Sequence, residues 1–373
     1  MGRKIKLGII YDHNSTWIGG FYYIQNLILS LKTLRKEDFP DITILTNSTE
    51  SFKEFEKLTE YPQLKFFKMD AFFKWKSLFF FLFEKMFRIK LRKPVFDVFY
   101  PNPSICILSL SEKNIFWKPD FQELHFPEFF SKIKLKTRES FVKRAIKHGD
   151  AIVFSSQDSK NDFESNYNYA NIRTFVLPFA VTNDLKNLPE FSELKVKYGL
   201  KNKFFILPNQ VWIHKNHITV FKAVKELKEE IPNIQIVCTG KEHDYRAPKL
   251  TIELKKFIKD NGLESNILML GFIPRKDLLG LMKESCALIQ PSLFEGWNTS
   301  IEDAKSMNKF VIASNLAVHR EQLSEEHAKF FDPKNIAELK QAIKDVYSGD
   351  FRYELNYEKL ISNFGKNFLE SLK

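Results

Sequence analysis

The chain has 373 residues, a length typical of two or three domains. Hydrophobic residues make up 44% and charged residues 28%, which excludes a disordered chain, and 13 glycines and 15 prolines exclude a collagen-like or low-complexity one. Lys and Arg outnumber Asp and Glu by 57 to 46, and the net charge of +11 favours an anionic partner: nucleic acid, a phosphorylated substrate or an anionic membrane face.

The cysteines and the apolar runs indicate the compartment. Cys106, Cys238 and Cys286 are far apart and odd in number, so we expect neither a disulfide framework nor a zinc cluster, as in a reducing compartment. The longest wholly apolar run covers about six residues near position 80, against roughly 20 for a spanning helix. No secretory signal pattern is visible at the start of the sequence. We therefore expect a cytoplasmic protein.

In the first half of the chain, short apolar runs alternate with helical patterns. We predict a helix over residues 21–34, after the pair Gly19-Gly20, and another after Ser156, which is a good N-cap. The predicted strands are residues 4–11, 42–46, 64–67 and 151–155. This alternation predicts a parallel sheet covered by helices on both faces.

A second alternating set begins near residue 200. The predicted strands are residues 203–207, 234–239, 266–270, 287–290 and 310–314. The predicted helices are residues 218–230, 250–261, 277–283 and 300–307. The polar stretch 182–193 reads as a linker, with a hinge near 178–195. We expect two doubly wound α/β domains, 1–180 and 181–350, with a ligand in the cleft between the domains.

The strongest candidate site is the stretch 291–305, which follows a predicted strand and opens a helix. The turn before this helix exposes N–H groups, which suit an anion. Glu295 lies before the helix and Asp303 eight positions later, so two carboxylates could hold separate hydroxyl groups of a long polar ligand. The alternative is that Glu295 only caps the helix and Asp303 is solvated.

Two further strand-to-helix turns carry polar residues. Lys215 is expected at a helix N-terminus, where a cation and free N–H groups together suit a diphosphate. His214 and His217 could face one metal ion, but no third ligand with zinc-like spacing stands nearby, so capping or packing is the preferred interpretation. The pair Gly19-Gly20 allows close backbone approach to a ligand, although it lacks a full dinucleotide fingerprint.

The aromatic stretch 117–130 is too irregular to predict a helix, and it could present His125 at a loop tip. A lone histidine is more often structural than functional.

These stretches together carry a family resemblance. The run Phe-Glu-Gly-Trp-Asn-Thr-Ser-Ile-Glu-Asp-Ala-Lys at 294–305 resembles the glutamate–seven residues–glutamate motif of glycosyltransferase family 4, in its Glu-Gly-Trp-Ser-Thr variant. The runs 209–217 and 314–322, the Gly-Gly loop and the segment 120–130 are similar to the same subgroup and occur in its order. The resemblance implies the GT-B architecture, which consists of two Rossmann-like domains facing across a cleft that holds a sugar nucleotide. It also implies that residues 351–373 contain a C-terminal helix, at about 353–372, which crosses back to the first domain.

The resemblance also implies roles for individual residues. Glu295 would contact the donor sugar, Lys215 would hold its diphosphate, and His125 would lie beside the transferring sugar. Asp303 would hold the ribose hydroxyls. The remaining expected donor contacts are Gly19, Gly20, Gln210, Asn298, Thr299 and Ser300.

Three departures from the family pattern stand in this site. Asp303 is one methylene shorter than the usual glutamate, which makes Glu302 a rival for the ribose. Gln210 replaces the usual arginine, and Asn298-Thr299-Ser300 replaces the usual Gly-Leu-Pro.

The expected reaction is therefore retaining transfer of a hexose, of mannose or glucose type, from a nucleoside diphosphate sugar to a glycan or lipid-linked acceptor in cell-surface polysaccharide or lipopolysaccharide synthesis. No metal and no cofactor beyond the donor are expected. A sugar-nucleotide epimerase and a non-catalytic sugar-nucleotide-binding protein are the alternatives on the same fold. Nucleic acid is disfavoured, because the basic residues are spread along the chain.

The last feature is the segment 71–93, which combines aromatic residues with seven Lys and Arg residues. This composition is typical of a helix that lies in the interface of an anionic membrane, which would make the protein peripheral at the inner face. The alternative is a helix packed on the N-terminal sheet with a solvated basic end.

Overall fold

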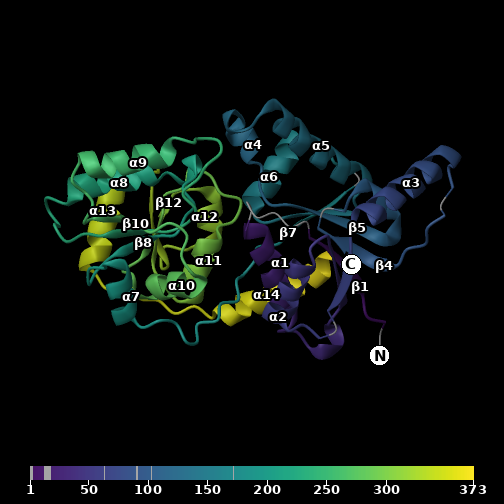
Figure 1. The fold of residues 1–373 in the computed structure, drawn as a ribbon, viewed down its shortest axis with the longest axis horizontal. Coiled ribbons are helices and arrows are strands. Elements are labelled where there is room, and N and C mark those ends of the chain that lie inside the picture. The colour runs from purple at the N-terminus through teal and green to yellow at the C-terminus, as the bar shows by residue number, and fades with distance from the viewer. Residues whose placement is uncertain (1–2, 12–17, 63, 90, 102, 171) are drawn as a thin grey trace. The chain divides into compact units, whose positions relative to one another are not determined.

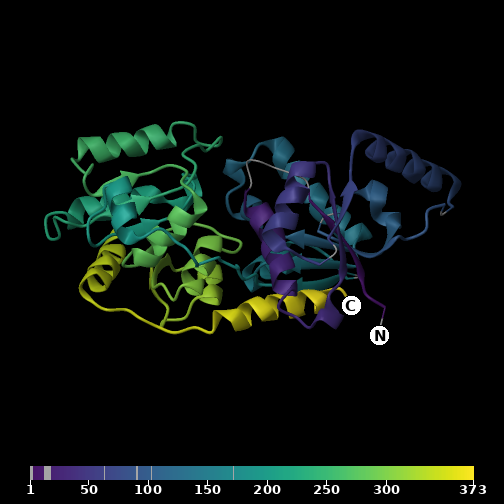
Figure 2. The ribbon, with the colours of Figure 1, turned by 60° about the horizontal axis from the view of Figure 1, so that its bottom comes forward.

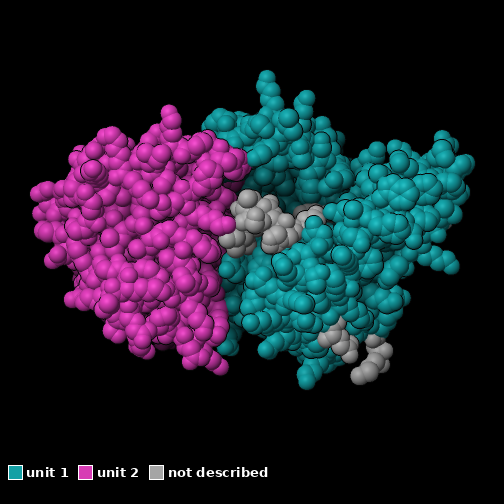
Figure 3. Space-filling view, viewed as in Figure 1, with its two compact units in different colours: residues 1–182, 358–373 teal, residues 183–357 magenta. Residues whose placement is uncertain are grey.

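The structure is a computed structural model that describes residues 3–11, 18–62, 64–89, 91–101, 103–170 and 172–373. These residues form two compact units, which Figure 3 colours separately: unit 1 comprises residues 1–182 and 358–373, and unit 2 comprises residues 183–357. The boundaries expected from the sequence, after residues 180 and 350, lie two and seven residues before those of the units.

Unit 1 contains a parallel sheet with the order β3-β2-β1-β4-β5-β6-β7. Its strands are β1 (Lys6–Ile10), β2 (Asp41–Thr46), β3 (Lys65–Lys68), β4 (Phe96–Tyr100), β5 (Ser111–Lys118), β6 (Ala151–Phe154) and β7 (Arg173–Val176). The central strands are apolar on both faces, as expected for a sheet between two helical layers. Leu7, Phe99, Phe116 and Phe154, for example, are completely buried.

The helices of unit 1 include the C-terminal one (Figures 1 and 2). They are α1 (Ile18–Leu31), α2 (Thr49–Thr59), α3 (Ala71–Phe87), α4 (Gln122–His125), α5 (Lys132–His148), α6 (Gln157–Asn166) and α14 (Tyr357–Ser371). Gly365 lies so close to α1 that a Cβ atom there would come within 2.7 Å of the Ser30 carbonyl oxygen. The absence of a side chain therefore allows α14 to pack on α1.

Unit 2 contains a second parallel sheet with the order β10-β9-β8-β11-β12-β13. Its strands are β8 (Phe205–Leu207), β9 (Ile236–Cys238), β10 (Ile267–Met269), β11 (Leu288–Gln290), β12 (Val311–Ser314) and β13 (Ala328–Phe331). Its helices are α7 (Phe191–Tyr198), α8 (His217–Leu227), α9 (Leu250–Asp260), α10 (Arg275–Glu284), α11 (Thr299–Ser306), α12 (Ala317–Gln322) and α13 (Ile336–Ser348). One apolar cluster fills each face of this sheet, so side chains such as Ile206 and Phe205 pack on opposite sides.

The expectation of two doubly wound α/β domains is confirmed. The expectation that residues 117–130 form no helix is wrong, because this stretch contains α4 and a 3-10 turn at Pro127–Phe129. Ion pairs hold this segment in place, and sequence periodicity does not reveal them. Among the described residues, no helix combines the length and the apolar character needed to cross a membrane.

Candidate functional site

The candidate site of unit 2 lies where the strand order of its sheet reverses. In the strand order, β8 and β11 are neighbours although they are far apart in the chain. The strands that follow β8 in the chain lie on one side of this pair, and those that follow β11 lie on the other side. Ligands of open parallel sheets bind at the carboxyl ends of strands at such a switch point. The loops that leave β8 and β11 meet here, since the Leu293 N–H donates to the His214 carbonyl oxygen at 2.7 Å.

The loop after β8 ends in a tight turn that positions Lys215. Residues Ile213–Lys215 form a 3-10 turn, and Asn216 then adopts a left-handed conformation with a φ of 55°. The Asn216 side chain donates to the carbonyl oxygens of Pro291 and Pro333 at 3.1 and 3.2 Å. Because asparagine tolerates this backbone conformation well, the turn can end here and α8 can begin at His217.

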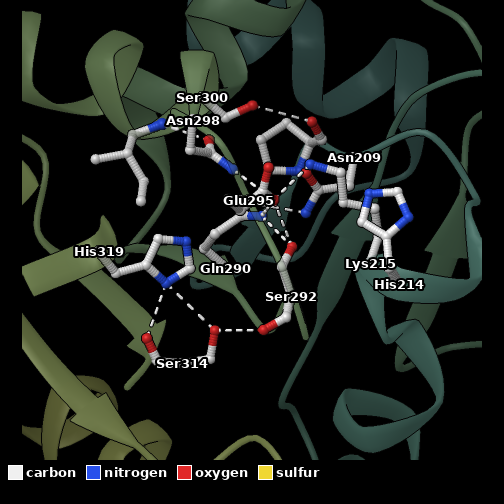
Figure 4. Close-up of polar contacts among 12 residues, drawn as sticks. Asn209, His214, Lys215, Gln290, Ser292, Glu295, Asn298, Ser300, Ser314 and His319 are labelled. Carbon is white, nitrogen blue, oxygen red and sulfur yellow. Dashed lines mark hydrogen bonds and ion pairs between the residues drawn. The ribbon is translucent and has the colours of Figure 1, made fainter. Parts of the chain in front are cut away.

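Lys215 and Glu295 form a buried ion pair at the switch point (Figure 4). The Lys215 Nζ lies 2.5 Å from the Glu295 Oε1, and the two side chains are 14% and 8% exposed. The same oxygen accepts hydrogen bonds from Ser292 Oγ at 2.6 Å, Asn298 Nδ2 at 2.9 Å and Gln290 Nε2 at 3.0 Å. Three neutral donors and the Lys215 cation therefore fix the carboxylate.

The N-terminus of α11 completes the loop after β11. The Asn298 side chain accepts from the Ile301 N–H at 3.0 Å and so caps the helix. Thr299 and Ser300 form the first turn, whose N–H groups have no partners within a helix and suit an anion. Both side chains are half-buried, and the Ser300 hydroxyl donates to the Pro208 carbonyl oxygen at 3.2 Å.

Asp303 is buried in unit 2 and does not point into solvent. Arg275 reaches it with two nitrogens, at 2.5 Å to Oδ1 and 2.8 Å to Oδ2, and Asn183 Nδ2 donates to Oδ1 at 3.0 Å. The interpretation in which Glu295 caps the helix and Asp303 is solvated is therefore wrong. Asn298 is the cap, and Asp303 has a cationic partner.

Glu302 is equally buried but faces other groups. Its Oε1 accepts from Lys305 Nζ at 2.9 Å and from Gln322 Nε2 at 3.0 Å, and its Oε2 accepts from the Tyr357 hydroxyl at 2.7 Å. The two adjacent carboxylates thus have separate sets of partners, so substitutions can distinguish their roles.

A third loop, after β9, approaches the same edge. Gly240 has a φ of 125°, and a Cβ atom there would lie 2.5 Å from the Asn209 carbonyl oxygen and 2.8 Å from the Gln210 nitrogen. Only glycine fits both the conformation and the approach. Gln210, in the loop after β8, is half-buried, and its expected contact with a diphosphate stays a prediction.

The histidines around the ion pair are neutral at physiological pH. Burial, together with the Lys215 and Arg246 cations, lowers the pKa of His214 well below its usual value. Burial and Lys215 lower the pKa of His217 to about 4. The His214 Nδ1 lies 3.3 Å from a nitrogen of Arg246. Within the described ranges, no group of three or more His, Cys, Asp or Glu side chains is arranged to hold a metal ion.

The candidates of unit 1 have surroundings of their own. Residues 12–17 of the Gly-Gly loop lie outside the described residues, whereas Gly19 and Gly20 form part of the first turn of α1, the former exposed and the latter buried. His125 ends α4 with its side chain exposed, and its Nε2 lies 2.8 Å from the Asp162 carboxylate. The carboxylate orients the imidazole.

A buried ion network supports α4. Lys118 contacts Glu123 at 2.7 Å, while Arg138 contacts Glu123 at 2.6 Å and Asp120 at 2.7 Å. Burial lowers the pKa of Lys118. Burial alone would raise the pKa of Asp120, but Arg138 and Lys118 hold it below its usual value. The network fixes the backbone that carries His125.

Sequence reasoning missed several polar residues of the unit 2 site. Gln290 ends β11 and accepts from Asn209 Nδ2 at 3.1 Å, which links the two loops. His319 is buried, its Nδ1 lies 2.8 Å from the Ser314 carbonyl oxygen, and its Nε2 is buried without a hydrogen-bond partner. Since the carbonyl can only accept, Nδ1 carries the proton and Nε2 is an acceptor. Two signals were available: a glutamine at the end of a predicted strand, and the run 314–322, which contains His319 and resembles the family.

Comparisons with known proteins agree with this fold. Residues 190–367 match the family model described as "Glycosyl transferases group 1". The O-antigen chain mannosyltransferase RfbU of Salmonella typhimurium is 23% identical over 257 residues, which cover 66% of this chain and 67% of that protein. Protein CapJ of Staphylococcus aureus is 28% identical over 174 residues, 46% of this chain and 41% of its own length.

Solved structures match over nearly the whole chain. The Anabaena HepE protein in complex with UDP and glucose has a TM-score of 0.68 at 16% identity and covers 97% of this chain and 94% of its own. A glycosyltransferase from Rickettsia africae has a TM-score of 0.64 at 16% identity and covers 100% and 94%. The chain therefore has the GT-B fold seen in these glycosyltransferase structures, and its residues 190–367 are similar to the group 1 glycosyl transferases.

Proposed function

We propose that the protein transfers a hexose, of mannose or glucose type, from a nucleoside diphosphate sugar to a hydroxyl group of a glycan or lipid-linked acceptor, with retention at the anomeric carbon. The observation that carries this proposal is the contact between Lys215 and Glu295 at the switch point of unit 2, beside the N-terminus of α11. A cation and free N–H groups suit the diphosphate, and a fixed carboxylate suits the sugar hydroxyls.

In the proposed reaction, the bond between the anomeric carbon and the diphosphate oxygen breaks, and its electron pair leaves with the diphosphate. Lys215 and the first N–H groups of α11 would stabilise this developing negative charge. The acceptor oxygen forms the new bond on the same face of the sugar, and its proton passes to the departing phosphate. Glu295 would hold the sugar, and His125 would flank its positive anomeric centre.

The nucleotide end of the donor would meet the two adjacent buried carboxylates. We propose that Asp303 holds the ribose hydroxyls, with Glu302 as its rival, and that Gln210, Gly19 and Gly20 contact the phosphates. Arg275 would then orient the Asp303 carboxylate, with which it forms two hydrogen bonds.

The relatives support a role in surface polysaccharide synthesis, since one is named as an O-antigen chain mannosyltransferase. A neighbour of the same fold was solved with UDP and glucose, which supports a nucleotide sugar as donor. We further propose that transfer needs no metal ion, because Lys215 supplies a cation at the expected diphosphate position. Full activity in the presence of a chelator is the expected result, and its loss would contradict this part.

A donor panel tests the proposal as a whole. GDP-mannose, UDP-glucose, UDP-galactose, UDP-N-acetylglucosamine and GDP-fucose are each added to the protein, and the shift in melting temperature identifies the donor, since ligand binding stabilises by RT ln(1 + [L]/Kd). NMR of the product with an acceptor then gives the anomeric configuration. An inverted product would refute retention, and turnover without acceptor would identify an epimerase. Donor binding without any turnover would identify a binding protein.

A further inference from the structure

Helix α3 of unit 1 exposes a continuous apolar surface. The ribbon views place α3 at the periphery of this unit (Figures 1 and 2). Seven large apolar side chains on the helix have exposed fractions between 43% and 68%: Phe72, Trp75, Leu78, Phe79, Leu82, Met86 and Phe87. At 3.6 residues per turn the first six fall on one side of the helix, which we call the outer face, and Phe87 lies beyond its edge at the end of the helix. The opposite side contains Ser77, which is buried.

Cations border this outer face, and the one acidic residue of the helix is turned away from it. At the same helical spacing, Lys74 and Lys85 lie along one margin of the face and Lys76 along the other, and all three are exposed. Glu84 lies on the inner side, 2.6 Å from Arg92, with the two side chains 11% and 12% exposed. The hydrogen bond from Arg92 lowers the pKa of Glu84, so the pair remains ionised.

The chain after α3 extends the same pattern. Glu84 also accepts from the Leu91 and Arg92 N–H groups at 3.0 and 2.9 Å, so the segment that follows the helix is tied back to it. Ile89, Leu91 and Val95 are exposed there. Half of the large apolar side chains that the described part of the protein exposes thus lie between residues 72 and 95.

We propose that α3 and the described residues after it, 88–89 and 91–95, form a docking surface for an anionic lipid bilayer, on which the helix lies in the plane of the interface. An apolar strip with lysines at both of its margins matches acyl chains below anionic headgroups. A second copy of the chain fits less well, because a symmetric pair would bring the lysine margins of two α3 helices together. The surface is separate from the switch-point site, so this proposal stands independently of the donor.

Vesicle flotation of the full chain tests the proposal. The vesicles contain phosphatidylcholine with about one third phosphatidylglycerol, and pure phosphatidylcholine is the comparison. A variant with Lys74→Gln, Lys76→Gln and Lys85→Gln should lose affinity by on the order of 100-fold, since each basic residue near an anionic surface contributes about 1 kcal/mol. A second variant with Trp75→Ser, Leu82→Ser and Met86→Ser should lose binding to both kinds of vesicle.

Matched control variants distinguish docking through α3 from a general effect of the protein's net charge. Lys222→Gln, Lys225→Gln and Lys259→Gln remove the same charge from exposed positions on α8 and α9, and this variant should bind nearly as the wild type does. All variants should keep the native melting temperature, because the substituted side chains are exposed. Trp75→Phe should retain binding but lose the part of the fluorescence blue shift that vesicles induce through Trp75.

Three results would overturn the proposal. One is equal loss of binding in the α3 and control lysine variants. Another is unchanged flotation of the serine variant. The third is a lipid-free dimer, seen by sedimentation equilibrium, that the serine substitutions convert to a monomer, since α3 would then be an interface between copies of the chain.

Discussion

Replacing Lys215 by methionine should lower stability because Glu295 loses its partner, and it should lower turnover because the diphosphate loses its cation. The Lys215→Met substitution keeps most of the apolar stem but leaves the Glu295 carboxylate buried without its cation. Loss of one partner of a buried pair costs about 3–5 kcal/mol. We expect the lower end, about 3 kcal/mol, because three neutral donors still bind the carboxylate. For a unit of this size, that lowers the melting temperature by about 6–12 °C.

A second substitution separates the two effects. In the double variant Lys215→Met/Glu295→Gln, no uncompensated charge remains, and a buried ion pair replaced by neutral groups of similar size is often no less stable. Most of the lost stability should therefore return. Turnover should stay depressed by about 100- to 1000-fold in both variants, the usual cost of removing one group that stabilises developing charge.

Melting by differential scanning calorimetry and kcat/KM for the identified donor are the assays. Arg92→Met is the matched control, because it breaks a similarly buried pair with Glu84 in unit 1. It should destabilise the chain and leave donor affinity unchanged. If Lys215→Met retains native kcat/KM, the assignment of Lys215 to the diphosphate is refuted. If the double variant is no more stable than the single one, the ion-pair reasoning is refuted.

Two further predictions concern buried groups of unit 2. Asp303→Asn should weaken nucleoside diphosphate binding, measured by titration, more than Glu302→Gln does, and the reverse order would transfer the ribose role to Glu302. His217 has a pKa of about 4 in the folded chain. As the pH falls below about 6.5, this imidazole therefore takes up a proton in the unfolded chain before it does so in the folded chain. Stability should decrease by about 3 kcal/mol through this group between pH 6.5 and 4. In urea unfolding across this pH range, His217→Leu should reduce the number of protons taken up on unfolding by one. An unchanged slope of the unfolding free energy against pH would show that the imidazole is not buried as described.

Local sequence patterns predict many of the buried, continuous strands, although β5 was missed with residues 114–118 all buried. Strands such as β6 and β12 are buried at every position, and their apolar runs stand out. Strand β7 was missed because its four residues are exposed or half-buried. Strand β4 was missed because it follows a segment so rich in phenylalanine that no periodicity marks its start.

The site shows a different limit. Sequence reasoning identified Lys215 and Glu295 separately, from turns that follow predicted strands. Their contact across 80 positions depends on β8 lying beside β11, and no local pattern encodes strand order. The partnership of Asp303 with Arg275 likewise depends on how α10 packs against α11. From its own helix alone, the Asp303 carboxylate can be assigned to solvent or to a ligand. The sequence does not show that its partner is a cation 28 positions away.

Isothermal titration with a nucleoside diphosphate and with its parent nucleoside tests the central claim, that the switch point of unit 2 holds the diphosphate of a sugar nucleotide. The base is that of the donor identified by the panel. Lys215→Met should lower the affinity for the diphosphate by tenfold or more, the equivalent of about 1.4 kcal/mol or more, because it removes the cation beside the phosphates. The same substitution should leave the weaker affinity for the nucleoside unchanged. Equal losses for the two ligands, or no loss for either, would contradict the account.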